Sequence, residues 1–302
     1  VCDGSQMIGD TMIKCSAYPG AHGTETLEEV IANSCNDAMM QIADKMGAEQ
    51  FIKSQSLFNF GTRTGIDLPN EGTGIVHTED TMGATELACS AFGQGFTCTM
   101  IQEINAICSV INGGYYYQPH LVSSIEDSQG TVIKNIEPTL LKQTVSSSIS
   151  ADIRSYMRAS VESGTSHYSK VQGYSSGGKT GTAEKFPRNN GKYLVSFVGF
   201  APVDDPAVVI YVVVDEPNAD RQDNSAYPQY IAQGILSELL PYLEVVPDET
   251  SDGYVPETEL WEGFNGLVKG ISTDGTTIED IRYNENGDYD ENGEYDEDGN
   301  YV

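Results

Sequence analysis

Three apolar segments between residues 176 and 216 constrain the fold of this chain more than any other feature. They read GGKTGTAEKF, KYLVSFVGFA and AVVIYVVVDE, and each has the length and the β-branched or aromatic content of a strand. The breaks between them, at 187–191 and 202–206, are short and contain proline. Because short connections join antiparallel neighbours, we predict a three-stranded antiparallel meander.

Helical patterns lie on both sides of this segment in the sequence. Capping boxes begin at Thr26 and Thr99, each followed by apolar residues at helical spacing. Two more helices are predicted near 150–163 and 227–243, whereas 61–74 is rich in turn formers and is predicted to be a loop. The sequence therefore predicts an α+β fold, with an antiparallel sheet flanked by helices and a helical subdomain.

One helix boundary matters for the chemistry below. Asn36 or Asp37 is expected to cap a helix that Gly47 ends. The tripeptide Ser34-Cys35-Asn36 then lies in the joint between two helices. Capping would by itself account for serine and asparagine at this position.

Charge divides the chain into two units. Lys and Arg total 16 against 45 Asp and Glu, a net charge of −29, which disfavours nucleic acid as a partner. Residues 248–302 hold 17 of the acids and only two bases. We therefore predict a folded unit at 1–247 and an acidic, disordered tail at 248–302.

The end of the tail contains a six-residue repeat, YNENGD YDENGE YDEDGN, from Tyr283. Asp288, Asp290 and Asn292 imitate the start of a calcium-binding loop. The twelfth position is Gly299, however, where such a loop needs a bidentate glutamate. A solvated tail without a specific calcium site is the prediction.

The six cysteines lack the paired Cys-x-x-Cys spacing of zinc proteins, so no metal site is predicted from the sequence. Two interpretations stay open. Cys2 and Cys15 form a disulfide if the protein lies outside the cytoplasm, or all six are reduced and mostly buried thiols.

The stretch GYSSGGKT at 173–180 matches three catalytic patterns. A nucleotide-binding P-loop needs a buried strand before it and a helix after it, but the preceding residues are polar and glycine and proline follow. A nucleophile elbow at Ser175 needs a later histidine, and all four histidines precede it. Ser176 and Lys179 match Ser-x-x-Lys, yet three positions apart in an extended segment their side chains point to opposite faces. What remains is Lys179-Thr180-Gly181-Thr182 as a strand motif.

Ser-x-Asn and Lys-Thr-Gly occur together in β-lactamases and penicillin-binding proteins. The surrounding text resembles the transpeptidase domain of class B penicillin-binding proteins over nearly all of 1–247. The segments that carry the resemblance, in the family's order and approximate spacing, are HGTETLEEVIANSCNDAMMQIADKMG, FNFGTRTGIDLPNE, SAFGQGFTCTMIQEINAICSVINGG, PHLV, GGKTGTAEK and SFVGFAPVDDPAVVIYVVVDEP.

The resemblance implies a β-lactamase/transpeptidase-like fold and a known reaction. A serine of the family attacks the D-Ala-D-Ala end of a peptidoglycan stem peptide, releases D-alanine and passes the acyl group to an amine. β-Lactams acylate the same serine. The alternatives are a D,D-carboxypeptidase, a β-lactamase-like hydrolase, and a non-catalytic module that binds wall peptides or β-lactams.

The same resemblance implies roles for six residues. Ser34 would relay protons, and the Asn36 amide would bind the substrate backbone. Lys179 would place positive charge beside both the relay and the terminal carboxylate, which the Thr180 and Thr182 hydroxyls would bind. The Thr182 amide would serve the oxyanion hole, and Gly181 would let substrate approach the strand. The alternative is a surface strand with an ordinary lysine. No cofactor is expected, since acyl transfer needs only side chains and amides.

One departure from the family pattern is serious. The nucleophilic serine of a Ser-x-x-Lys motif should lie several tens of residues before the matching histidine-glycine segment. Residues 1–33 offer only the imitation Thr11-Met12-Ile13-Lys14. We therefore expect a fragment, inactive alone, of a protein on the extracytoplasmic face of the cell membrane. Its membrane anchor and non-catalytic domain would lie upstream, and a glycosyltransferase is an expected partner.

Overall fold

A three-stranded sheet forms the centre of the computed structural model, which describes residues 1–188 and 190–249. Its strands are β7 (Gly177–Glu184), β8 (Tyr193–Ala201) and β9 (Val208–Asp215). They pair antiparallel in the order β7-β8-β9, so the predicted meander is confirmed. The central strand β8 has partners on both sides, whereas β7 and β9 are edges of this sheet.

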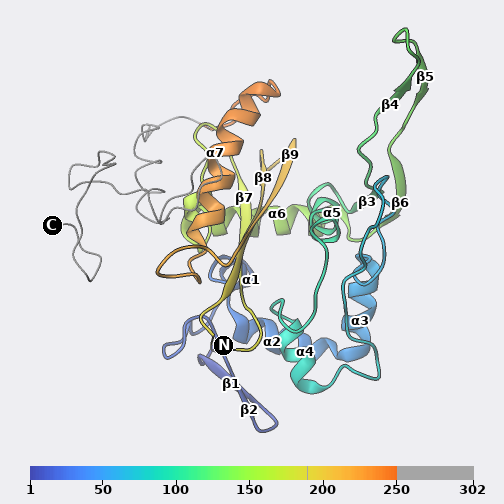
Figure 1. Cartoon of the computed structure of the whole chain (residues 1–302). Coiled ribbons are helices and arrows are strands. Elements are labelled where there is room, and N and C mark those ends of the chain that lie inside the picture. Colours follow the sequence, from blue (N-terminus) through green and yellow to red (C-terminus); the bar gives the residue numbers. More distant parts are fainter. Residues whose placement is uncertain (189, 250–302) are drawn as a thin grey trace, which may run out of the picture.

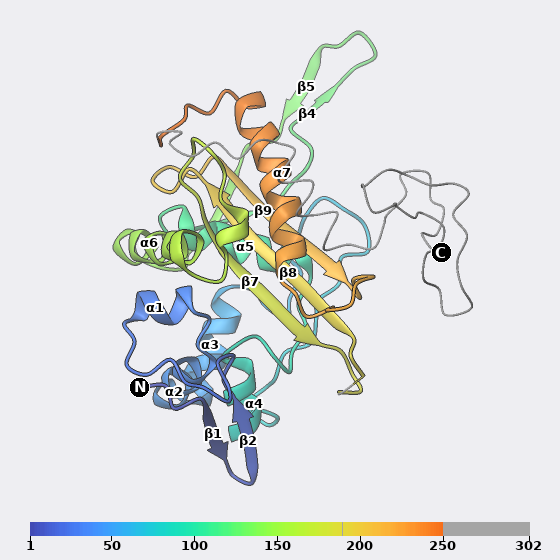
Figure 2. The same cartoon turned by 90° about the vertical axis from the view of Figure 1, so that its left-hand side faces the viewer.

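Helices cover both faces of the sheet (Figures 1 and 2). On one face α7 (Ala226–Tyr242) packs Leu236 and Leu240 against Ala201 of β8. On the other face lie α5 (Met100–Ile111) and α6 (Ser147–Ser163), which bury Ile111 and Met157 against Phe200. Because successive strand residues point to opposite faces, β8 is apolar at almost every position and is buried on both sides.

Residues 1–90 form a mainly helical group below the sheet (Figure 2). The short helix α1 (Leu27–Ala32) packs on α6. Gly164 makes this close approach possible, because a Cβ at position 164 would lie only 2.3 Å from the Ala32 carbonyl oxygen. The predicted capping box of Thr26 is confirmed. The other elements are β1 (Ser5–Ile8), β2 (Thr11–Lys14), α2 (Asn36–Met46), α3 (Ala48–Leu57) and α4 (Ala84–Ser90).

An arm of short hairpins projects away from the sheet (Figure 1). Strand β3 (Tyr115–Gln118) pairs with β6 (Thr139–Gln143), and β4 (Ser124–Glu126) pairs with β5 (Val132–Asn135). The remaining element is the 3-10 turn η1 (His167–Ser169). Residues 61–74 contain no helix or strand, as predicted.

The end of the described chain is attached to the sheet. The Ser175 N–H donates to Asp248 Oδ1 at 2.7 Å, and Arg158 forms an ion pair with Glu249. The six-residue repeat and the imitation calcium loop lie outside the described residues. Over the residues that are described, none of the helices combines the length and the apolar character that a bilayer crossing requires.

Candidate active site

A cavity of about 420 Å³ lies between the α1–α2 joint and strand β7. The sequence-predicted site residues all line it or border it, although they come from two parts of the chain. Ser34 and Asn36 lie in the helix joint, and Lys179, Thr180, Gly181 and Thr182 lie on β7. The fold thus brings together the two motifs that the sequence separates.

Lys179 and Ser34 touch directly. Lys179 Nζ donates to Ser34 Oγ at 2.8 Å and to the Thr180 carbonyl oxygen at 3.0 Å. Burial lowers the Lys179 pKa from 10.5 to about 8, because the surroundings desolvate the ammonium form. The amine is therefore partly neutral near physiological pH and can exchange a proton with the serine hydroxyl.

Ser34 has an unusual backbone conformation. Its φ is 55°, in the left-handed region that β-carbon-bearing residues rarely occupy. The Ser34 carbonyl accepts a hydrogen bond from Ser16 Oγ at 3.0 Å, and Asn36 Nδ2 donates to the Lys14 carbonyl at 3.4 Å. Contacts from the N-terminal hairpin thus hold both motif residues in the joint.

Neither Ser34 nor Asn36 caps a helix. The N-cap of α2 is Cys35, whose sulfur accepts from the Ala38 N–H at 3.4 Å. The predicted cap at Asn36 or Asp37 is therefore wrong, because the thiol lies inward and occupies the capping position. Capping no longer accounts for the Ser34 and Asn36 side chains, both of which line the cavity.

The other motif residues lie along the edge strand. Thr180 Oγ1 donates to Thr165 Oγ1 at 3.2 Å, and Thr182 is exposed. At Gly181 a Cβ would lie 2.5 Å from Ser196 Oγ of β8, so a side chain there would press on the neighbouring strand. This contact gives Gly181 a packing role that the sequence did not indicate.

Since β7 pairs only with β8 in the described sheet, its other edge has no partner strand, and the Thr180 and Thr182 carbonyls there accept from the Lys179 and Gln94 side chains instead. An extended peptide can add to such an edge through main-chain hydrogen bonds. The hydroxyls, the amine and the edge amides therefore form a surface suited to a peptide with a carboxylate.

Three further cavity residues were not predicted. Thr165 bonds Thr180 and is held by the Ala32 carbonyl, which accepts from the Thr165 N–H at 3.0 Å. Gln94 Nε2 donates to the Thr182 carbonyl at 3.3 Å, so the turn that contains Gln94 also borders the site. Ser16 comes from the N-terminal hairpin. No local sequence signal singles out Thr165 or Ser16.

Two of the competing patterns at 173–180, the P-loop and the nucleophile elbow, do not fit the structure. Gly177–Glu184 is a strand, so the helix that a P-loop requires is missing there. Ser175 Oγ accepts from the buried Val203 N–H at 2.8 Å and also bonds Asp248, so it is a structural hydroxyl.

The cysteines show an arrangement that their spacing does not reveal. All six are free, and Cys2, Cys15 and Cys35 are buried together beside His22. The prediction of no metal site rested on the absence of paired Cys-x-x-Cys spacing in the sequence. Because these side chains meet in three dimensions, the lack of that spacing no longer argues against a metal site.

Comparisons with known proteins identify the family of the chain. The sequence profile described as "Penicillin binding protein transpeptidase domain" matches residues 4–238. Stage V sporulation protein D of Bacillus subtilis is 40% identical over 234 residues, which are 76% of this chain and 36% of that protein. Penicillin-binding protein PbpB of Mycolicibacterium smegmatis is 29% identical, with 64% of this chain and 31% of that protein covered. The chain spans about a third of the length of these relatives.

Solved structures show the same fold. Penicillin-binding protein 3 of Mycobacterium tuberculosis, complexed with ampicillin, superposes with a TM-score of 0.73 at 24% identity, covering 83% of this chain and 58% of that one. The transpeptidase domain of penicillin-binding protein 3 from Burkholderia pseudomallei gives a TM-score of 0.70 at 25% identity, covering 82% and 72%. The predicted β-lactamase/transpeptidase-like fold is confirmed. On the strength of the profile match and these relatives, the chain belongs to the penicillin-binding protein transpeptidase family, in its class B branch.

Proposed function

We propose that this chain forms the proton-relay and carboxylate-binding side of a serine-type peptidoglycan D,D-transpeptidase. The observation that carries the proposal is the hydrogen bond from Lys179 to Ser34 in a cavity bordered by the edge of β7. The nucleophilic serine, with its Ser-x-x-Lys lysine, would come from upstream polypeptide. On this proposal, residues 1–302 alone do not form an acyl-enzyme.

Ser34 and Lys179 would move the proton. In the acylation step a serine hydroxyl forms a bond to the D-Ala carbonyl carbon, and the peptide bond to the terminal D-alanine breaks. The proton of the attacking hydroxyl would pass to the neutral lysine of its Ser-x-x-Lys motif, the Ser34 hydroxyl would give a proton to the leaving amine, and the Lys179 ammonium would restore the Ser34 hydroxyl, so that one proton is taken up and one is delivered. In the second half-reaction the amine of a neighbouring strand attacks the acyl group, and the protons move in the reverse direction.

The remaining residues would position the peptide. Thr180 and Thr182 hydroxyls would bind its carboxylate beside the Lys179 charge, and the Thr182 N–H would donate to the developing oxyanion. The Asn36 amide would bind the substrate backbone. Reactions of this kind need no metal or organic cofactor at the reacting atoms, only side chains and amides.

The cellular setting follows from the same proposal. Stem peptides ending in D-Ala-D-Ala and β-lactams are the ligands, and both lie outside the cytoplasm. An upstream membrane anchor would hold the domain at the extracytoplasmic face. A glycosyltransferase that polymerises the glycan strand is the expected partner.

A fluorescent penicillin tests the proposal. The label is applied to residues 1–302 and to a chain extended upstream to its natural start, and intact mass is measured for both. We expect a covalent adduct on the extended chain only. An extended chain that stays unlabelled would favour a non-catalytic binding module, and rapid turnover of the penicillin would favour the β-lactamase alternative.

The rate of labelling should depend on pH. Because burial lowers the Lys179 pKa to about 8, the neutral amine increases as the pH rises through that value. Because the Lys179 ammonium would restore the Ser34 proton and face the carboxylate, the acylation rate of the extended chain should decrease between about pH 7 and 9 as this charge is lost. Stopped-flow fluorescence across this range measures the midpoint. A rate that rises through pH 8 would contradict the assignment of Lys179 as the proton donor to Ser34.

A further inference from the structure

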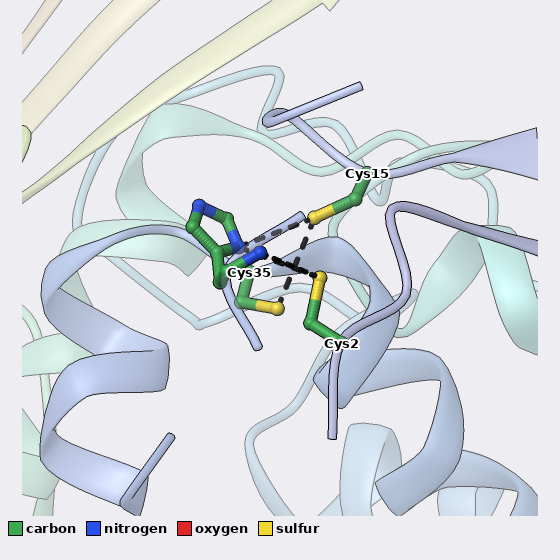
Figure 3. Close-up of side chains that lie close together, drawn as sticks. Cys2, Cys15 and Cys35 are labelled. Carbon is green, nitrogen blue, oxygen red and sulfur yellow. Dashed lines mark hydrogen bonds between the residues drawn. The ribbon is translucent and has the colours of Figure 1, made fainter. Parts of the chain in front are cut away.

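Four potential metal ligands converge beneath the active site, and nothing in the proposed reaction uses them. They are the sulfur atoms of Cys2, Cys15 and Cys35 and a ring nitrogen of His22, all within 4.8 Å of one another. Figure 3 shows the three sulfur atoms turned toward one shared space. The residues come from both ends of the β1–β2 hairpin, from the segment after it and from the α2 N-cap.

Three of the six separations match a tetrahedral zinc centre. Zn–S bonds of about 2.3 Å and a Zn–N bond of about 2.0 Å at tetrahedral angles place sulfurs about 3.8 Å apart and sulfur and nitrogen about 3.5 Å apart. Here Cys15 Sγ and Cys35 Sγ are 3.8 Å apart. His22 Nδ1 lies 3.6 Å from Cys2 Sγ and 3.6 Å from Cys15 Sγ. A disulfide, in contrast, needs sulfurs about 2.05 Å apart.

The cluster has the surroundings of a closed site. The three cysteines are 2%, 4% and 0% exposed in chain order. Backbone N–H groups already point at two of the sulfurs, since His22 donates to Cys2 Sγ at 3.4 Å and Ala38 donates to Cys35 Sγ at 3.4 Å. Such donors stabilise thiolates, whereas four uncharged buried groups would not require them.

Glu25 lies at the edge of the cluster. Its side chain is 5% exposed, and Oε2 lies 3.8 Å from His22 Nδ1. Asn33 donates to Oε1 at 2.9 Å, but Oε2 has no hydrogen-bond partner within the described part of the chain. A buried carboxylate oxygen without a partner is costly, so Oε2 is a further polar atom beside the cluster that the proposed reaction leaves unused.

We infer that Cys2, Cys15, His22 and Cys35 bind one Zn²⁺ ion through three sulfurs and Nδ1. Three thiolates and an imidazole are a ligand set that zinc prefers, and four protein ligands leave no position for water, so the ion is structural. Binding converts Zn²⁺ and three thiols into a complex of net charge −1 and releases three protons to solvent. No oxidant or reductant takes part.

The ion would connect the N-terminal hairpin to the active site. Cys35 lies between Ser34 and Asn36, and Cys15 lies beside Ser16, whose hydroxyl holds the Ser34 carbonyl. Asp37 strengthens the same junction, because its carboxylate accepts from the Asp3 N–H at 2.8 Å. Zinc at this point therefore fixes the joint in which Ser34 adopts its left-handed conformation.

Metal content of the purified 1–302 chain tests the inference without any catalytic readout, so its outcome is independent of the proposed function. The chain is prepared with reductant, passed through gel filtration and measured by plasma mass spectrometry and native mass. We expect about one zinc per chain. Cobalt substituted for zinc should give thiolate-to-cobalt charge-transfer bands and the visible spectrum of a tetrahedral site.

Single substitutions assign the ligands. Cys15→Ser and His22→Gln should lower zinc affinity by more than about 100-fold in chelator competition, since even outer-sphere changes cost 10- to 100-fold. Cys89→Ser, a half-buried cysteine of α4 outside the cluster, is the matched control and should keep one zinc. Because the cobalt spectrum is recorded on the wild-type chain, it tests the inference even if one of the variants fails to fold.

Three results would overturn the inference. One is a reduced wild-type chain without zinc above the buffer blank. Another is a cobalt spectrum without thiolate bands. The third, on a chain prepared without reductant, is a metal-free protein two hydrogens lighter than its reduced mass whose peptide map places a disulfide within the cluster in place of the ion.

Discussion

Replacing Lys179 by methionine in the upstream-extended protein is expected to slow penicillin acylation by a factor of about 10² to 10⁴. Methionine keeps much of the side-chain volume but removes the amine that donates to Ser34 Oγ at 2.8 Å. It also removes the charge that is proposed to face the substrate carboxylate. The second-order rate of fluorescent penicillin labelling measures the loss directly, and the pH dependence near 8 should disappear with it.

Lys185→Met is the matched control for this experiment. Lys185 follows the same strand but forms exposed ion pairs with Asp215 and Glu216, remote from the cavity. Its replacement should change the acylation rate by less than about twofold, because exposed ion pairs contribute little. If both variants lost acylation rate to the same extent, the effect of Lys179→Met would not be specific to the cavity, and the catalytic role assigned to Lys179 would be wrong.

Phe200→Ala should lower the free energy of unfolding by about 3 to 5 kcal/mol. The Phe200 ring is 0% exposed and packs between β8 and the helices α5 and α6. The cavity cannot close easily from the β7 side, where Gly177 has no side chain to move into it. A Cβ at Gly177 would lie only 2.5 Å from the ring, which shows how closely the backbone packs on it.

Urea denaturation followed by circular dichroism measures this loss on residues 1–302. Phe186→Ala is the control, because Phe186 is 81% exposed and its removal should change stability by no more than about 0.5 kcal/mol. A Phe200→Ala protein that unfolds at the wild-type urea concentration would mean that this face of the sheet is loosely packed.

Strongly periodic segments were predictable from the sequence. The three strands of the sheet, the capping boxes at Thr26 and Thr99 and the C-terminal helix follow from local patterns that packing reinforces. The helix α6 begins at Ser147, three residues before its predicted start, because the Ser146 hydroxyl caps it.

The N-terminal hairpin and the projecting arm were missed for one physical reason. Their strands are three to five residues long, and several are largely exposed, as the pattern eeie of β2 and eeee of β5 shows. Such strands lack the alternation of apolar and polar residues that identifies a strand, and in β3 the single buried side chain, Tyr116, is too little to create it.

The site was only partly predictable. Family motifs identified Ser34 and Lys179, but the left-handed φ of Ser34 and the capping role of Cys35 depend on contacts that no local pattern encodes. The cysteine cluster is the clearest case. Residues 2, 15, 22 and 35 have no regular spacing, and only the turn of the hairpin brings their side chains together.

The Lys179 to Ser34 hydrogen bond joins residues 145 positions apart in the sequence. Contacts of such long range form late, because the entropy of closing a large loop must be overcome before they can form. During synthesis the joint around Ser34 emerges long before its partner on β7. A growing or partly unfolded chain therefore holds the two halves of the cavity apart, and chemistry at this position is confined to molecules that have completed folding.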